Sequence, residues 1–181
     1  HISYLVKVSS NEKIIGSILV KDFNLPLYVM LATKNGQIKR TLLKDFEVSR
    51  YSKPLKCMGL KNDDKVIGVK LTDNNQGIIL TTKAGYGAMY SEQEISITGV
   101  KASGVKAINL RNDELVSLNI FDPMINCSLM MISENVGIKR IKVGDIIPCN
   151  RATKGSLLYK NPKSKIIYTK KAIVVDNQQK I

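Results

Sequence analysis

The chain has 181 residues, with 28 Lys and Arg against 15 Asp and Glu, which gives a formal net charge of +13. A hydrophobic fraction of 44% fits one folded domain with a core and excludes a disordered tail. No run of 18 apolar residues and no signal peptide is seen, and a start at His1 suggests a piece of a longer polypeptide. The positive excess predicts a polyanionic partner, with nucleic acid first and an anionic membrane surface second.

Three short apolar runs predict buried strands. In chain order they span residues 28–33, 78–82 and 129–133. Each run leads into a tight turn, at Asn35-Gly36, Ala84-Gly85 and Asn135-Val136-Gly137. We therefore expect three β-hairpins.

Other segments alternate between apolar and polar residues. Ile67, Val69 and Leu71 alternate with polar or small residues, which predicts a half-buried strand. The strand after the third turn alternates imperfectly, because Lys139 and Arg140 are adjacent. No segment carries a helical apolar stripe, and only a short helical turn is expected around residues 43–48.

The sequence repeats with a period of about fifty residues. The segment Leu60-Lys61-Asn62-Asp63-Asp64 returns 50 residues later as Leu110-Arg111-Asn112-Asp113-Glu114. The hairpin segment 33–40 returns at 133–140 with its Lys-Arg pair in register, and the middle copy, 82–89, has Ala88-Met89 there. We divide the chain into a half unit, two full units and a last unit, at residues 1–24, 25–75, 76–124 and 125–181.

A repeated all-β unit of this length predicts a propeller blade of four strands. One small twisted sheet cannot bury both of its faces, whereas blades packed around an axis cover one another. The absence of Trp excludes the tryptophan-aspartate blade signature. Three and a half units are fewer than the usual four to eight blades, so we expect an incomplete ring, or one closed by neighbouring sequence.

The positive charge is concentrated in two stretches. Residues 139–171 hold ten Lys and Arg and one acid, Asp145, and residues 34–61 are also rich in Lys and Arg. In a blade repeat, cations that recur with the repeat form a stripe around one edge of the disc. Such an edge suits duplex DNA, whose phosphates supply most of the affinity through counterion release. A single Lys on a β surface is, however, more often just a solvated residue.

No motif for catalysis or metal binding survives inspection. Cys57, Cys127 and Cys149 are far apart and His1 is the only histidine, so we expect mostly buried thiols and neither a zinc site nor a histidine base. The segment 99–106 resembles a phosphate loop but has Val105 where that loop needs Lys. The acid pairs Asp63-Asp64 and Asp113-Glu114 are predicted to stabilise turns.

Four motifs together resemble a known family, the C-terminal domain of the A subunits of bacterial type IIA topoisomerases. They are TKNGQIKRT from Thr33, RYSKPL from Arg50, LKNDD from Leu60 and EISITGVKASGVKAINL from Glu94. The likeness is closer to the A subunit of topoisomerase IV from low-GC Gram-positive bacteria than to the A subunit of gyrase. It covers nearly the whole chain and is weakest after about Lys160.

The resemblance implies a β-pinwheel whose blades exchange strands and whose basic rim binds and bends double-stranded DNA for strand passage, decatenation and relaxation. It also implies an A₂B₂ enzyme in the bacterial cytoplasm, at the nucleoid, that uses ATP and magnesium. Catalytic residues are expected elsewhere in that enzyme, and no cofactor, metal or small-molecule substrate is expected in this chain. The candidate DNA contacts are Lys34, Lys39, Arg40, Lys44, Arg50, Lys53, Lys83, Lys101, Lys106, Lys139, Arg140, Lys142, Arg151 and Lys154.

Two alternatives stay open on the sequence alone. The first is a gyrase-type domain that wraps DNA; the glutamine-arginine-arginine-glycine box of such domains is absent here, but it normally precedes the repeats. The second is a propeller that binds other proteins and is basic for unrelated reasons. A steep dependence of affinity on salt distinguishes a DNA-binding domain from the latter.

Overall fold

The computed structural model describes residues 12–49, 54–135, 137–160 and 169–176. In the last of these ranges it describes the side chains of Ile173–Val175 only. Its strands are β1 (Tyr28–Thr33), β2 (Gln37–Leu42), β3 (Val66–Thr72), β4 (Gly77–Thr82), β5 (Tyr86–Ser91), β6 (Val105–Lys106), β7 (Leu115–Phe121), β8 (Cys127–Ser133), β9 (Ile138–Lys142), β10 (Ser156–Leu157) and β11 (Thr169–Asp176). Three short 3-10 turns follow the hairpins: η2 (Leu43–Phe46), η3 (Glu92–Glu94) and η4 (Val143–Asp145). The described residues contain no α-helix, and the predicted all-β, propeller-like fold is confirmed.

The three predicted hairpins are β1–β2, β4–β5 and β8–β9. Gly36 and Gly85 adopt φ values of 78° and 87° in the first two turns, a conformation that glycine reaches without steric cost. The hydroxyl of Thr33, at the end of β1, accepts a hydrogen bond from the backbone N–H of Gln37 at 3.1 Å. Thr82 and Ser133 do the same in the other two hairpins, so each turn is fixed by the last residue of its first strand.

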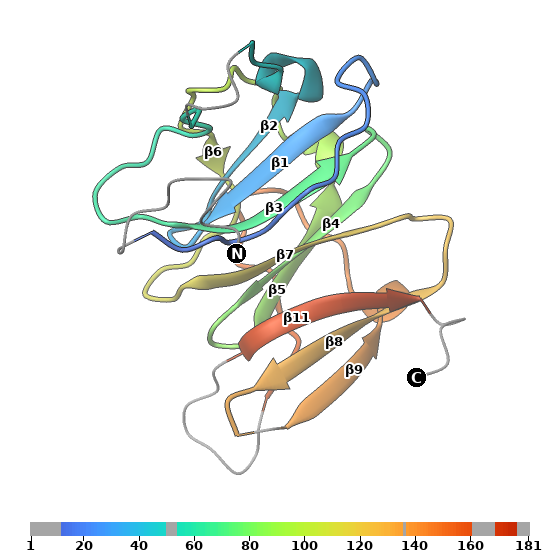
Figure 1. Cartoon of the computed structure of the whole chain (residues 1–181). Helices are drawn as coiled ribbons and strands as arrows, with labels where there is room; N and C mark the ends of the chain where they lie inside the picture. The colour runs from blue at the N-terminus through green and yellow to red at the C-terminus, as the bar shows by residue number, and fades with distance from the viewer. Residues whose placement is uncertain (1–11, 50–53, 136, 161–168, 177–181) are drawn as a thin grey trace.

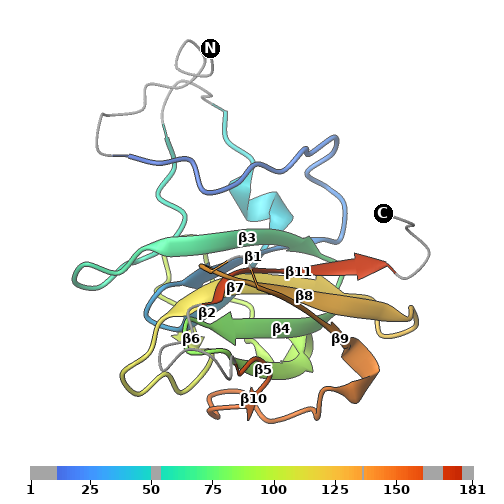
Figure 2. The same ribbon diagram turned by 90° about the horizontal axis from the view of Figure 1, so that it is seen from below.

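Each hairpin belongs to its own antiparallel sheet, and the three sheets follow one another from top to bottom in Figure 1. The strand orders are β3-β1-β2-β6, β10-β5-β4-β7 and β11-β8-β9. One margin of each sheet lies near the same margin of the next, because β3 contacts β7 and β7 contacts β11 (Figure 2). The opposite margins, formed by β6, β10 and β9, therefore face outward.

The fourth strand of a sheet comes from the next repeat unit. Strand β6 pairs with Gln37 and Ile38 of β2, and β10 pairs with Tyr86 and Gly87 of β5. A glycine with positive φ precedes each of these strands, and the ideal Cβ positions of Gly104 and Gly155 lie 2.4 Å from Ile38 O and 2.0 Å from Gly87 O. The implied strand exchange is thus confirmed. Within the described part of the chain, β9 has no fourth strand beside it.

The cores lie between the sheets. Ile78 and Leu80 of β4 belong to the core shared with the first sheet, whereas Ile79 between them belongs to the core shared with the third. A strand buried on both faces has no polar alternation, which explains the continuous apolar run seen in the sequence. Strand β3 is half-buried, but the predicted alternation is not seen, because its first six residues are all partly exposed.

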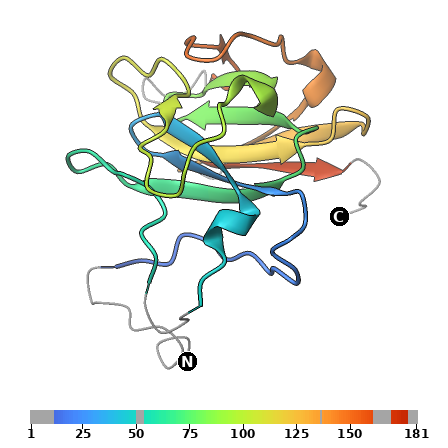
Figure 3. The same cartoon turned by 90° about the horizontal axis from the view of Figure 1, so that it is seen from above.

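The segment 12–27 lies beside the first sheet, on the side away from the other two (Figure 3). Val20, Phe23 and Leu27 pack against the third apolar cluster, which includes Leu31 of β1. The segment forms no strand, although the sequence assigns residues 1–24 to a half unit of the repeat. The exact unit boundaries stay a prediction.

Candidate nucleic-acid interface

The recurring pair Lys39-Arg40 does not lie on the surface, so the expectation that its side chains face solvent at the rim is wrong. Lys39 is 0% exposed and Arg40 is 4% exposed. The Nζ atom of Lys39 donates hydrogen bonds to the carbonyl oxygens of Cys57, Gly99 and Val100, at 2.9, 2.9 and 2.5 Å. Burial lowers the pKa of Lys39. This side chain therefore links β2 to the segments around residues 57 and 99–100, and its charge is not accessible to a phosphate.

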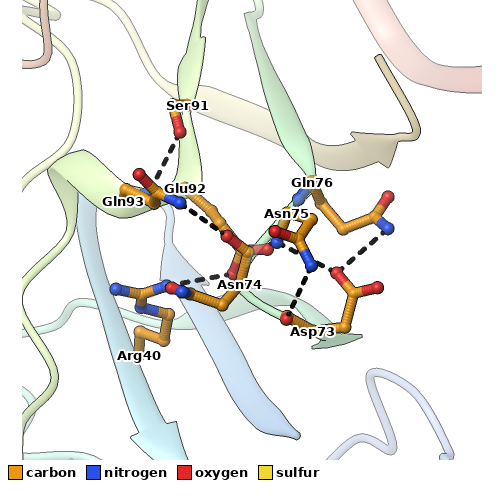
Figure 4. A network of polar contacts seen from close by, with 8 residues as sticks. All are labelled: Arg40, Asp73, Asn74, Asn75, Gln76, Ser91, Glu92 and Gln93. Atoms are coloured by element: carbon orange, nitrogen blue, oxygen red, sulfur yellow. Dashed lines mark hydrogen bonds and ion pairs between the residues drawn. The ribbon is translucent and has the colours of Figure 1, made fainter. Parts of the chain in front are cut away.

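Arg40 is bound in a polar network between the first two sheets (Figure 4). Its Nη1 atom donates to Asn74 Oδ1 at 2.6 Å and to Glu92 Oε2 at 3.3 Å. The other oxygen of Glu92 accepts from the backbone N–H of Gln76 at 2.8 Å, and the guanidinium lies 4.8 Å from the ring centroid of Tyr28. Arg40 is a link between consecutive units.

The same sequence pair has a different environment in the third sheet. Lys139 and Arg140 are exposed, since no strand covers β9 within the described residues, whereas the segment 98–106 covers the outer side of β2. Lys139 Nζ donates to Leu158 O at 2.6 Å, and Arg140 Nε donates to Ser128 Oγ at 3.0 Å. The exposure of the Lys-Arg pair thus depends on whether a segment of the next unit covers the second strand of the hairpin, as 98–106 covers β2.

Basic side chains recur along the outward margins of the three sheets, and the exposed carboxylate of Glu94 lies beside them, where it accepts from the N–H of Arg151 at 2.8 Å. The segments 98–106, 138–142 and 149–157 contain no Asp or Glu. Their cations are all exposed or half-exposed, and all were among the predicted contacts. We call this set the outer basic edge: Lys101, Lys106, Lys139, Arg140, Lys142, Arg151 and Lys154.

Local contacts fix several of these side chains in place. Arg151 Nη1 donates to the backbone oxygen of Lys106 at 2.6 Å, and its Nε donates to the backbone oxygen of Glu94 at 3.1 Å. Lys154 Nζ lies 3.7 Å from the ring centroid of Tyr86, a cation–π contact. The cations on this edge are therefore partly preorganised, which lowers the entropy lost when they bind a ligand.

The other predicted contacts lie elsewhere. Lys34 and Lys83, near the hairpin turns, converge on Glu114 with N–O distances of 2.8 and 3.7 Å. The hydrogen bond from Lys34 lowers the pKa of Glu114. Lys44, in η2, forms an ion pair with Glu47 at 2.5 Å. Arg50 and Lys53 lie outside the described residues.

The acid pairs stabilise turns, as expected. Each pair stabilises both the turn in which it lies and the turn of a hairpin. Asp64 Oδ1 accepts from the N–H of Lys65 at 2.8 Å and from that of Asn35, in the first hairpin turn, at 2.9 Å. Asp113 does the same for Glu114 and Ala84. The repeated spacing of 29 residues between turn and Asp was a signal for this brace in the sequence. The described residues hold no cluster of three or more His, Cys, Asp or Glu able to bind a metal ion, and none of their helices is long and apolar enough to cross a membrane.

Comparison with known proteins agrees with this geometry. Residues 27–73, 78–122 and 128–163 match the family model described as the DNA gyrase C-terminal domain, beta-propeller. The chain is 32% identical over 164 residues to the A subunit of DNA topoisomerase 4 from Bacillus subtilis and 34% identical over 165 residues to that from Staphylococcus epidermidis. These alignments cover 90% and 91% of this chain but 20% of each relative, so the chain spans about a fifth of their length.

Solved structures extend the comparison. A crystal structure of the C-terminal domain of DNA topoisomerase IV matches with a TM-score of 0.90 and 34% identity, over 97% of this chain and 55% of that one. The C-terminal domain of E. coli ParC matches with a TM-score of 0.72 at 13% identity, over 97% of this chain and 70% of that one, and shares the fold. The resemblance predicted from the motifs is confirmed, and the chain belongs to the DNA gyrase C-terminal domain family of β-propellers.

Proposed function

We propose that this chain is a non-catalytic domain that binds and bends duplex DNA within the A subunit of a type IIA topoisomerase, of the topoisomerase IV kind. The outer basic edge carries this proposal: seven cations along three consecutive sheets, on segments without a single acid. Each phosphate neutralised by such a cation releases condensed counterions, so affinity arises without base recognition. The similarity to topoisomerase IV and the net charge of +13 support the same interpretation.

The arrangement of the edge suits bent DNA. The cations lie on the outward strands β6 and β9 and on the loops that precede β6 and β10, so a duplex that curves along the margin meets them in succession. Smooth bending of 20–30 base pairs by 40–90° costs on the order of 1–6 kcal/mol, and several distributed contacts are needed to offset it. In the parent enzyme this domain would present a DNA segment for strand passage. ATP and magnesium would act in other parts of an A₂B₂ assembly in the bacterial cytoplasm.

Salt dependence tests DNA binding. Fluorescence anisotropy with a duplex of about 30 base pairs at several salt concentrations is expected to give a steep linear fall of log affinity with log salt. Substituting Lys106→Ala together with Lys154→Ala should weaken binding to all sequences alike and reduce the slope by about two. Lys65→Ala, which removes an exposed cation just before β3, away from the edge, is the matched control. A flat dependence, or an edge variant that binds like the control, contradicts the proposal and favours a protein-binding propeller.

DNA topology tests how far the duplex bends. Relaxed circles bound by the domain and treated with a nicking-closing enzyme are expected to change little in linking number if the DNA is bent. A large change of constant sign would instead assign the domain to the wrapping type and overturn the topoisomerase IV assignment.

A further inference from the structure

We propose that Lys39, although it touches no DNA, positions Lys101 for DNA binding by fixing the loop that carries it. This inference rests on the proposed function. It concerns the segment Thr98–Lys106, the part of the outer basic edge that covers the first sheet. We call Thr98–Ala102 the rim loop.

The contacts of Lys39 use its full donor capacity. A lysine ammonium has three N–H groups, and the three carbonyl oxygens of Cys57, Gly99 and Val100 accept one hydrogen bond each. Two of these carbonyls belong to consecutive residues of the rim loop. With both held inward, the next residue, Lys101, is exposed on the outside.

Backbone hydrogen bonds fix the loop on either side of these carbonyls. The N–H of Thr98 donates to Arg40 O at 2.8 Å, and the N–H of Gly59 donates to Ala102 O at 3.1 Å. The N–H of Ala102 also donates to Gly99 O at 3.1 Å and closes a turn. Lys39 therefore supplies the only side-chain donors that the structure gives to the middle of the loop, within the described residues.

Removal of the Lys39 ammonium would change the conformation of the rim loop before it affects the sheet. Without Lys39, Val100 O loses the one donor that the described residues give it, whereas Gly99 O keeps the hydrogen bond from the N–H of Ala102. An acceptor left unsatisfied beside the buried place of Lys39 is costly. The loop can regain this hydrogen bond by turning the carbonyl of Val100 to water, and this rotation moves Lys101. The ends of the loop stay anchored, so the sheet need not open.

Within the described residues, neither of the other two hairpins shows this arrangement. Ala88 stands at the place of Lys39 in the second hairpin, and the corresponding loop there is held by Arg151. Lys139, in the third hairpin, is exposed and bonds only Leu158 O among the carbonyls of the described residues. Lys139→Met is therefore a matched control for hydrogen exchange in the rim loop, because it removes a lysine at the equivalent place that holds no part of that loop. It is no control for DNA binding, because Lys139 belongs to the outer basic edge.

A double-mutant cycle on DNA binding tests the proposal, with the full chain and the same duplex. Lys101→Ala and Lys39→Met should each weaken binding several-fold, and the double variant should bind no worse than Lys101→Ala. Hydrogen exchange at the amides of Lys101 and Ala102 should accelerate in Lys39→Met and stay unchanged in Lys139→Met. Denaturant unfolding shows that each variant is folded; if Lys39→Met is not, Lys39→Gln, which keeps two N–H donors, replaces it.

The outcomes separate the two proposals. If Lys101→Ala weakens binding but Lys39→Met does not, or if the two effects add fully, the positioning role is overturned and DNA binding at the edge stands. If neither Lys101→Ala nor the edge variant Lys106→Ala with Lys154→Ala alters binding, the proposed function falls as well.

Discussion

Arg40 Nη1 lies 3.3 Å from Glu92 Oε2, and both side chains are almost fully buried between the first and second sheets. The next junction has an equivalent backbone hydrogen bond, from Cys149 N–H to Met89 O at 2.9 Å where Thr98 N–H donates to Arg40 O at 2.8 Å, but different side chains. Met89 and Val143 occupy the places of Arg40 and Glu92 there, and both belong to the apolar core between the second and third sheets. An ion pair thus links the first sheet to the second, whereas apolar packing takes its place between the second and the third.

This pair makes a prediction for stability. Arg40→Met or Glu92→Val alone should lower the free energy of unfolding by about 3–5 kcal/mol, because each leaves a buried charge without its partner. The double substitution should recover most of that loss, since it copies the apolar junction. Urea unfolding of the three variants measures this, and a double variant as unstable as the sum of the singles would contradict it.

The glycine before β6 is predicted to be indispensable. Gly104→Ala should destabilise the protein by at least about 1–3 kcal/mol, because Gly104 has a φ of 86° and its ideal Cβ position lies 2.4 Å from Ile38 O. Gly99→Ala is the control, since no atom lies within 4 Å of its ideal Cβ position, and its effect should stay within about 0.5 kcal/mol. Thermal unfolding compares the stability of the two variants. An equal loss of stability in both would show that the close approach of residue 104 to Ile38 O does not require glycine.

The lysines near the hairpin turns should matter less for DNA than the outer basic edge. Lys34 and Lys83 share the carboxylate of Glu114, which offsets part of their charge. Lys34→Ala and Lys83→Ala are therefore expected to weaken duplex binding less than Lys106→Ala does at the same salt concentration. Glu114→Gln should strengthen binding slightly. The opposite ranking in an anisotropy titration would place the DNA over the turns.

Alkaline pH should reveal how much the buried hydroxyl of Tyr90 contributes to the free energy of unfolding. Burial raises the pKa of Tyr90 well above its ordinary value of about 10, and its hydroxyl donates to Ala107 O at 3.0 Å. The folded state therefore keeps its proton where the unfolded state loses it, so this stability is complete below about pH 10 and is lost as the pH rises further.

The variant Tyr90→Phe isolates this effect. At about pH 7 it should be less stable than the unmodified chain by about 1 kcal/mol, for the lost hydrogen bond. Above about pH 10 the difference should shrink, because phenylalanine cannot ionise. Free energies of unfolding measured from neutral pH to about pH 11 would contradict this if the two curves stayed parallel.

Local chemistry explains why the hairpins and repeats could be predicted from the sequence. A run such as residues 78–82, followed by Ala84-Gly85, encodes a buried strand and its turn within a few residues. The outer strands could not be found in this way, because β6 and β10 are two residues long and depend on contacts with a preceding unit. Their signal was a glycine at the same place in two units, Gly104 and Gly155.

The candidate site was predicted less completely, for a physical reason. Lys39-Arg40 and Lys139-Arg140 are the same dipeptide in the same register, yet one pair is buried and the other exposed. Burial of an edge strand depends on the unit that follows, which a local pattern does not contain. Charge density was an incomplete guide as well: the dense stretch 139–171 contributes five members of the outer basic edge, whereas the dense stretch 34–61 contributes none.

Strand exchange has a mechanical consequence for a domain that bends DNA. A stiff duplex held in a curve pulls back on the side chains that grip it. Tension at Lys106 passes through the β2–β6 pairing into the first sheet and through the chain itself into the second. A force applied at one residue is thereby divided between two blades, so the bent DNA cannot separate a single blade from its neighbour without breaking the β2–β6 pairing.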